Sequence, residues 1–111
     1  MSENIFNYSI LTNGVMTGNL TSAVTDLSRV DGYAVYAIWT TGPVGTIKLQ
    51  ASVDGVSFID YPNSETPVNG AGNVIWEVTT AFYDKIRVVY TYTSGTGTLN
   101  VQINGKGDIL G

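Results

Sequence analysis

The sequence predicts an all-β fold: an antiparallel, jelly-roll-like β-sandwich of two sheets and about eight strands. Apolar and polar residues alternate in several segments, most regularly at residues 46–53, which places one row of side chains on a core and the other in water. Turn residues separate these segments at intervals of roughly 8–12 residues, as in sandwich folds. Glycine, threonine and asparagine are frequent, whereas strong helix formers are sparse.

The N-terminal region contains the least regular elements. Residues 5–12 are apolar and aromatic enough for a first strand, or for an arm that pairs with the sheet edge of a neighbour. Residues 22–30 fit two patterns. Val24, Leu27 and Val30 would share a helical face, whereas the serines and threonines favour a strand or loop. We adopt the strand.

Residues 33–40 predict a strand that is apolar on both faces. Its side chains form two rows, one of Tyr33, Val35, Ala37 and Trp39 and one of Ala34, Tyr36 and Ile38. Either both faces are covered within the domain, or one aromatic face meets another subunit, because only one side of a strand normally reaches the core of a two-layer domain. The first row is our candidate interface.

The remaining strands alternate regularly. Residues 46–53 lead into Asp54-Gly55, the preferred pair for a two-residue hairpin, since both turn positions need a positive φ. Residues 56–61 return, and strands at 73–79, 85–93 and 98–104 complete the set. Their predicted inward residues are Val74, Trp76, Val78, Ile86, Val88, Tyr90, Tyr92, Leu99, Val101 and Ile103.

The 111 residues fit one domain. Within it we expect an N-terminal strand or arm at residues 1–21, the β-sandwich at 22–107 and a short C-terminal tail at 108–111. The N-terminus lacks the basic start and apolar run of a signal peptide. No apolar stretch approaches the roughly 20 residues that span a bilayer. We therefore expect synthesis in a host cytoplasm and no membrane partner.

Composition and spacing argue against several functions. The net charge is −4 and the five basic residues are scattered, which does not suit a nucleic-acid partner. Cysteine and histidine are absent, so thiolate metal sites and the commonest general base are missing. The acidic residues weighed as catalytic pairs are Asp54, Asp60, Glu65, Glu77 and Asp84, and none has a recognisable catalytic spacing. We expect no enzyme activity, no cofactor and no metal.

Most aromatic side chains are expected in the core, because a domain of this size needs large side chains to bury enough area. Phe82 and Tyr83 precede a strand and are the pair expected to be exposed. They are the candidate glycan contacts.

Short motifs follow one another in a specific order from residue 26 onward. They are Asp26-Leu27-Ser28, Gly32-Tyr33-Ala34-Val35, Trp39-Thr40, residues 42–52, Asp54-Gly55, Gly70-Ala71-Gly72, Trp76, Ala81-Phe82-Tyr83, residues 87–99 and Lys106-Gly107. Over residues 22–107 this order resembles a group of small all-β structural proteins from the virions of tailed bacteriophages.

The resemblance implies a noncatalytic virion protein, either a capsid auxiliary or decoration protein or a module of a head or tail fibre. We further expect a homo-oligomer, for which we consider a trimer. Its expected partner is the major capsid protein or another virion protein. The alternative is a carbohydrate-binding β-sandwich that recognises a glycan of the host surface. Residues 48–58 are similar to a hairpin of discoidin-like jelly rolls, many of which bind sugars or lipid headgroups. We attribute that similarity to the general shape of tight hairpins.

Overall fold

The structure is a computed structural model that describes residues 2–26, 32–52, 54, 56–78 and 85–109. Within these residues it contains strands and turns, and no helix that could cross a membrane. The strands are β1 (Ser2–Val15), β2 (Leu20–Thr21), β3 (Thr25–Asp26), β4 (Gly32–Thr41), β5 (Val44–Ser52), β6 (Ile59–Asp60), β7 (Thr66–Asn69), β8 (Gly72–Val78), β9 (Lys85–Ser94) and β10 (Gly97–Ile109).

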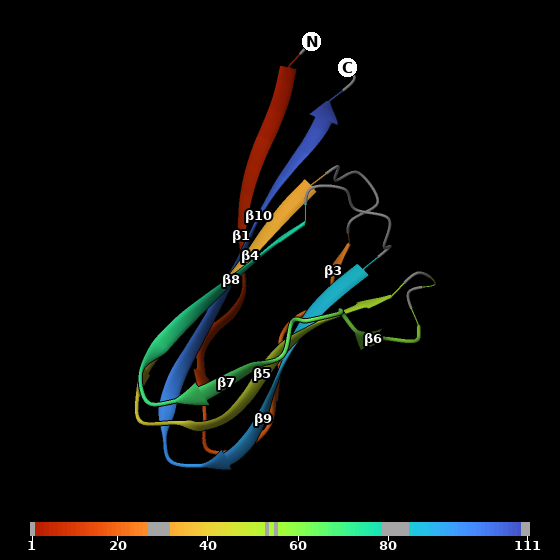
Figure 1. Cartoon of the computed structure of the whole chain (residues 1–111). Helices are drawn as coiled ribbons and strands as arrows, with labels where there is room; N and C mark the ends of the chain where they lie inside the picture. The colour runs from red at the N-terminus through yellow and green to blue at the C-terminus, as the bar shows by residue number, and fades with distance from the viewer. Residues whose placement is uncertain (1, 27–31, 53, 55, 79–84, 110–111) are drawn as a thin grey trace.

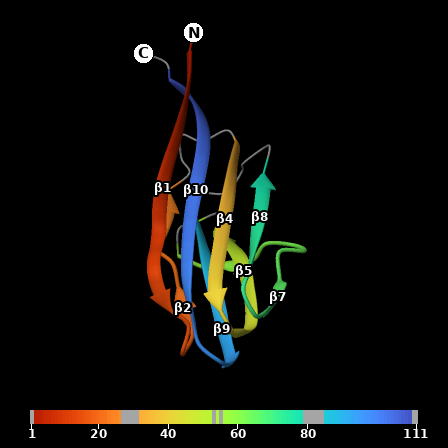
Figure 2. The same cartoon turned by 90° about the vertical axis from the view of Figure 1, so that its left-hand side faces the viewer.

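The strands form two antiparallel sheets that face each other (Figures 1 and 2). One sheet has the order β1-β10-β4-β8 and the other β2-β9-β5-β6, with β3 also on β9 and β7 also on β5. The pairs β2/β3 and β6/β7 each act as one interrupted strand, because both members lie on the same neighbour. Eight strands then remain in the described part of the chain, as in a jelly roll. The predicted fold class is confirmed.

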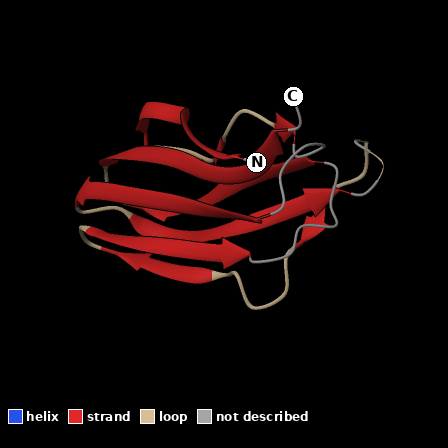
Figure 3. Cartoon of the chain, turned by 90° about the horizontal axis from the view of Figure 1, so that it is seen from above, coloured by secondary structure: helices blue, strands red, loops and turns tan. Residues whose placement is uncertain are grey.

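The core lies between the two sheets, whose strands Figure 3 shows from above. Ile47, Leu49 and Ala51 of β5 are buried on alternate positions, as their spacing predicts. The inward rows predicted for β8, β9 and β10 also face the core among the described side chains. Ile86, Val88, Tyr90, Leu99, Val101, Ile103 and Trp76 are buried, and Val74 and Tyr92 are partly buried against them.

The candidate interface on β4 requires a correction. Its four side chains are buried inside the sandwich: Tyr33 is 5% exposed, Val35 and Ala37 are 0% exposed and Trp39 is 4% exposed. They lie opposite the buried row of β10, where Val35 pairs with Ile103 and Trp39 with Leu99. Cross-strand partners share a face of the sheet, so this row is core and is not available to a partner. The other row of the strand is the exposed one.

The chain turns back after β5 as predicted, but not through a two-residue hairpin at Asp54-Gly55, of which Gly55 lies outside the described residues. Strands β5 and β6 pair through Gln50 with Asp60 and through Ala51 with Ile59, so the connection is much longer than two residues. Asp54 Oδ1 accepts hydrogen bonds from the backbone N–H groups of Val56 and Ser57, both at 2.8 Å. Through these two bonds the Asp54 carboxylate holds the described part of the turn.

Both ends of the described chain belong to one pair of strands. β1 pairs with β10 of the same chain from Ser2–Ile109 to Val15–Thr98, so the two ends leave the sandwich side by side (Figure 2). Asp108 and Ile109 of the predicted tail are part of β10. The predicted domain bounds stay predictions.

Candidate binding surface

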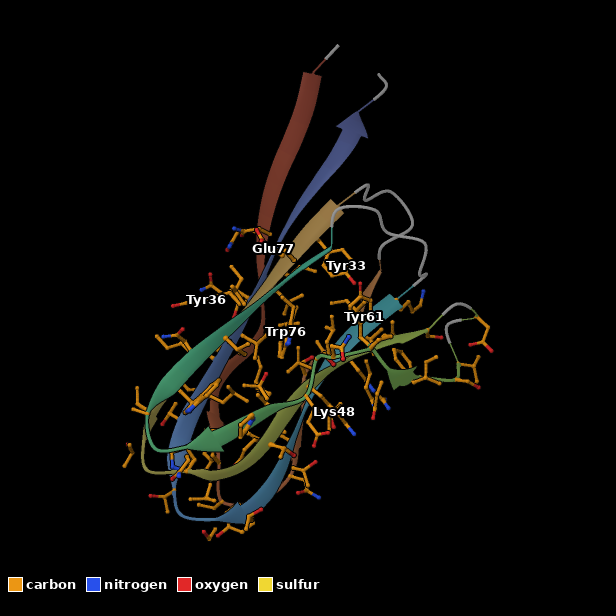
Figure 4. The ribbon with its side chains drawn as sticks, viewed as in Figure 1. Tyr33, Tyr36, Lys48, Tyr61, Trp76 and Glu77 are labelled. Atoms are coloured by element: carbon orange, nitrogen blue, oxygen red, sulfur yellow. The ribbon has the colours of Figure 1, made fainter. Side chains whose placement is uncertain are left out.

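The candidate site is the outer face of the β1-β10-β4-β8 sheet, on the side of β4 and β8. Period-two alternation turns Val74 and Trp76 of β8 inward and Ile75 outward. Tyr36 of β4 lies directly opposite Ile75 in the strand register. Figure 4 shows Tyr36 on the outer side of the sheet, whereas Tyr33 and Trp76 lie between the sheets.

Among the side chains that the structure describes, three apolar ones remain in solvent on this part of the face. Tyr36 is 39% exposed, Ile38 is 37% exposed and Ile75 is 57% exposed. We call these three residues the outer apolar patch. Scattered exposed apolar residues are ordinary, but these three lie on two adjacent strands and include a directly paired aromatic and β-branched residue. The patch therefore presents contiguous apolar surface.

Amide side chains make up much of the rest of the face, which also carries the exposed carboxylate of Glu77 on β8. Asn7 Nδ2 donates to Gln102 Oε1 at 3.3 Å and also to Asn104 Oδ1. Asn100 Oδ1 accepts the backbone N–H of Asn13 at 2.8 Å. Each amide can both donate and accept hydrogen bonds, so this part of the face can bind a polar partner.

A second feature is a depression of about 420 Å³ beside β5 and β6. It is lined by Lys48, Asp60, Tyr61, Pro62, Asn63, Ser64 and Glu65. Lys48 Nζ lies 3.1 Å from Asp60 Oδ2, and Gln50 Nε2 donates to Asp60 Oδ1 at 3.0 Å. The Gln50 amide and then Lys48 hold the pKa of Asp60 below its ordinary value. Figure 4 shows Lys48 and Tyr61 on this side of the molecule.

Ser64, which lines the depression, is connected to the core by hydrogen bonds. Its hydroxyl is buried and accepts the backbone N–H of Leu49 at 3.1 Å. The indole Nε1 of Trp76 donates to the Ser64 carbonyl oxygen at 3.0 Å. A ligand in the depression would thus lie next to a residue that contacts a buried tryptophan.

Several charged groups of this region have partners within the chain. Arg87 Nε donates to Gln50 Oε1 at 2.8 Å, and its guanidinium carbon lies 4.2 Å from the centre of the Phe58 ring. Asp54 and Asp60 accept hydrogen bonds from different sets of groups. In the part of the chain that the structure describes, no three acidic side chains gather into a metal site.

The comparisons with known proteins bear on the fold. Neither a protein-family model nor a curated protein sequence matches the chain. Among solved structures, the SPBc2 prophage-derived protein YomS is similar with a TM-score of 0.63 and 11% identity, over 94% of this chain and 96% of that one. The tobacco streak virus coat protein is similar with a TM-score of 0.58 and 7% identity, over 98% of this chain and 88% of that one.

A carbohydrate-binding structure is also similar. The CBM36-1 domain of a xylanase from the hindgut metagenome of Trinervitermes trinervoides has a TM-score of 0.52 and 7% identity, over 96% of this chain and 100% of that domain. At these identities the similarity shows the fold alone. The chain therefore has a β-sandwich architecture that is shared by viral coat proteins and carbohydrate-binding modules.

The site residues predicted from the sequence do not coincide with this surface. The predicted glycan contacts Phe82 and Tyr83 lie outside the described residues. The patch on Tyr36, Ile38 and Ile75 was not predicted, although two signals were present. The strand at 33–40 is apolar on both faces, and Ile75 is an apolar residue in the polar row of the strand at 73–79.

Proposed function

We propose that this chain is a noncatalytic structural protein of a bacteriophage virion, acting by protein–protein binding as a capsid auxiliary or decoration protein or as a module of a head or tail fibre. The observation that carries the proposal is the outer apolar patch on an otherwise amide-rich sheet face. Apolar surface rimmed by polar groups is typical of protein interaction sites. Such a protein acts by adhesion to other proteins, and the outer apolar patch is suited to that role.

The fold supports the same proposal by analogy. A prophage-derived protein and a viral coat protein share the architecture over nearly the whole chain. The ordered motifs over residues 22–107 resemble small structural proteins of tailed phages independently of this comparison. Because fold alone does not define function, the surface and the motifs carry more weight than the architecture.

The proposed partners are further copies of this chain and the major capsid protein or another virion protein. A particle presents many identical sites, so contacts of modest affinity together give stable attachment. The proposed location is the virion.

The test is the presence of the protein in purified particles. Particles from the source cells should be banded by density and analysed by mass spectrometry and by immunogold labelling with an antibody against the chain. We expect the protein to band with the particles, in many copies, and to be labelled on their surface. Protein found only in particle-free fractions would contradict the proposal.

The alternative function is glycan binding, and a different observation favours it. The depression beside β5 and β6 combines Tyr61 with amide, carboxylate and ammonium groups, the donors and acceptors that sugar hydroxyls use. A carbohydrate-binding domain shares the fold.

Tryptophan fluorescence tests this alternative, because Trp76 contacts Ser64 at the depression. A glycan bound there should change the emission in a saturable way, and Glu65→Gln should weaken the response. Glu77→Gln on the other sheet is the matched control. An unchanged spectrum across a broad panel of bacterial surface glycans would count against this function.

A further inference from the structure

We propose that strand β8 pairs antiparallel with β8 of a second copy of this chain, about a twofold axis at Ile75. The two four-stranded sheets would then form one continuous sheet across the dimer. This inference rests on the proposed function, since it names the first protein partner that the chain would bind.

The edge at β8 lacks the proline, lysine and register shifts that often prevent strands from pairing. β8 is the last strand of its sheet and pairs with β4 from Tyr33–Val78 to Trp39–Gly72 without a register shift. Its sequence, GNVIWEV, contains no proline and no lysine. A regular edge strand presents a row of backbone donors and acceptors, which serves as a template for another strand.

The opposite edge of the same sheet is protected. β1 has two register shifts, between Ser9 and Leu11 and between Leu11 and Gly14. Asn13 has a φ of 52°, and the Ile10 carbonyl oxygen accepts the N–H of Ala23 at 2.9 Å. Irregular pairing and a covering segment are common means of blocking an edge. Among the described residues, this contrast identifies β8 as the edge of this sheet that is open to a partner.

The sequence of β8 is complementary to itself in one register. Ile75 is the middle of its seven residues, so a twofold axis there pairs the whole strand. Ile75 then faces Ile75 of the second copy, and Asn73 faces Glu77 of the second copy. The amide of Asn73 can donate to that carboxylate, and no like charges lie opposite each other. A register centred on Glu77 would instead place two carboxylates together.

The same register extends the outer apolar patch. Tyr36 lies beside Ile75 within each copy. Across the axis, an unbroken row would run from Tyr36 through both Ile75 side chains to Tyr36 of the second copy. Pairing therefore reduces the exposure of the most exposed residue of the patch, which favours a second copy as the occupant.

The expected dimer is of limited strength. One edge of seven residues is smaller than the roughly 800 Å² per partner of a standard stable interface. We expect a dimer that dissociates on dilution and is favoured where copies are concentrated, as on a particle. A trimer, the state considered from the sequence, would need a different surface.

The first test compares Ile75→Lys with Ile59→Lys by multi-angle light scattering over a concentration series. Both residues are exposed isoleucines, at 57% and 69%, and Ile59 lies on β6 of the other sheet. The wild type and Ile59→Lys should approach twice the 11.9 kDa monomer mass at high concentration. Ile75→Lys should raise the dissociation constant about tenfold or more, because two lysines would meet at the axis.

Two variants of Asn73 test the register. Asn73→Lys should tighten the dimer, because each lysine faces Glu77 of the second copy. Asn73→Glu should weaken it, because two carboxylates would then face each other. Equal effects of the two variants would exclude this register.

A cross-link tests the twofold axis directly. The chain has no cysteine, so Ile75→Cys introduces a single thiol. Directly opposed residues in an antiparallel pair have Cβ atoms about 4.5–5.5 Å apart, at or just beyond the roughly 3.5–4.5 Å of a disulfide, so a small adjustment at the axis lets mild oxidation link the two copies. Ile59→Cys should stay largely monomeric under the same conditions.

Some outcomes would overturn the inference. They are a wild type that stays monomeric at the highest concentration, a trimer that Ile75→Lys leaves intact, and equal cross-linking of the two cysteine variants. Should the protein still band with particles in that case, the proposed function would stand and only the pairing at β8 would fail. If the protein dimerises as expected but is absent from particles, the pairing at β8 would stand and the proposed function would fail.

Discussion

Asp54 closes the turn after β5 with one carboxylate oxygen. That atom, Oδ1, accepts the Ser52 hydroxyl at 2.9 Å in addition to the backbone N–H groups of Val56 and Ser57. These three donors favour the ionised carboxylate. The amide of Ser57, then that of Val56, then the Ser52 hydroxyl hold the pKa of Asp54 below its ordinary value of 3.8.

We predict that Asp54 makes stability depend on pH at the acidic end. Because its pKa is lower in the folded chain than in the unfolded chain, its contribution is present in full above the ordinary value of 3.8. The contribution is lost as the pH falls through the lowered pKa. Urea unfolding from about pH 6 to about pH 2 should show a shallower loss for Asp54→Asn than for the wild type. Superimposable profiles would contradict this role.

Two interrupted strands border the β9-β5 pair, and a buried serine fills each gap. Ser22, between β2 and β3, accepts the Val88 N–H at 2.8 Å through its hydroxyl. Ser64, between β6 and β7, accepts the Leu49 N–H at 3.1 Å in the same way. Each hydroxyl supplies the acceptor that a continuous strand would have supplied through its backbone. Buried backbone N–H groups need such a partner.

We predict that Ser64→Ala costs about 1–3 kcal/mol in the free energy of unfolding, because the buried Leu49 N–H loses its acceptor. Ser22→Ala should behave similarly at Val88. Urea denaturation should show a lower midpoint with an unchanged slope. The exposed Ser94 at the end of β9 is the control, and Ser94→Ala should change stability by no more than about 0.5 kcal/mol. An equal midpoint for Ser64→Ala and Ser94→Ala would refute this account.

The stability of the fold depends on the buried row of β4, whose side chains face the second sheet. Trp39 is 4% exposed, and its indole Nε1 donates to the Gly70 carbonyl oxygen at 2.8 Å. The indole also packs against Gly72, where an added Cβ would lie 3.2 Å from the ring. One residue therefore connects β4, the β7–β8 turn and the core.

We predict that Trp39→Ala destabilises the fold by about 3–5 kcal/mol, the usual cost of truncating a buried tryptophan. Near-UV circular dichroism and urea denaturation should show an unfolded or marginally stable protein. Tyr36→Ala, on the outer row of the same strand, should stay folded and affect association instead. A well-folded Trp39→Ala protein with impaired assembly would restore the original interface prediction.

Alternation predicted the buried rows of β5, β9 and β10, because a strand with one apolar and one polar row has a single sensible orientation. It did not decide between the two apolar rows of β4. Similarly, the pair Asp54-Gly55 indicated that the chain turns, but not which residue of β6 would pair with Ala51. Local sequence predicts that a turn occurs, whereas the pairing of distant strands decides its length.

The sequence by itself determined that this chain is an all-β sandwich, since period-two patterns and turn residues are local properties. Only the tertiary structure decided which face of β4 is core, because that choice depends on the row of β10 that lies opposite it. Tertiary pairing likewise placed β8 at an open edge and Ile75 beside Tyr36. Strand order is a non-local property, and so the surface available to a partner emerges only when the two sheets have formed.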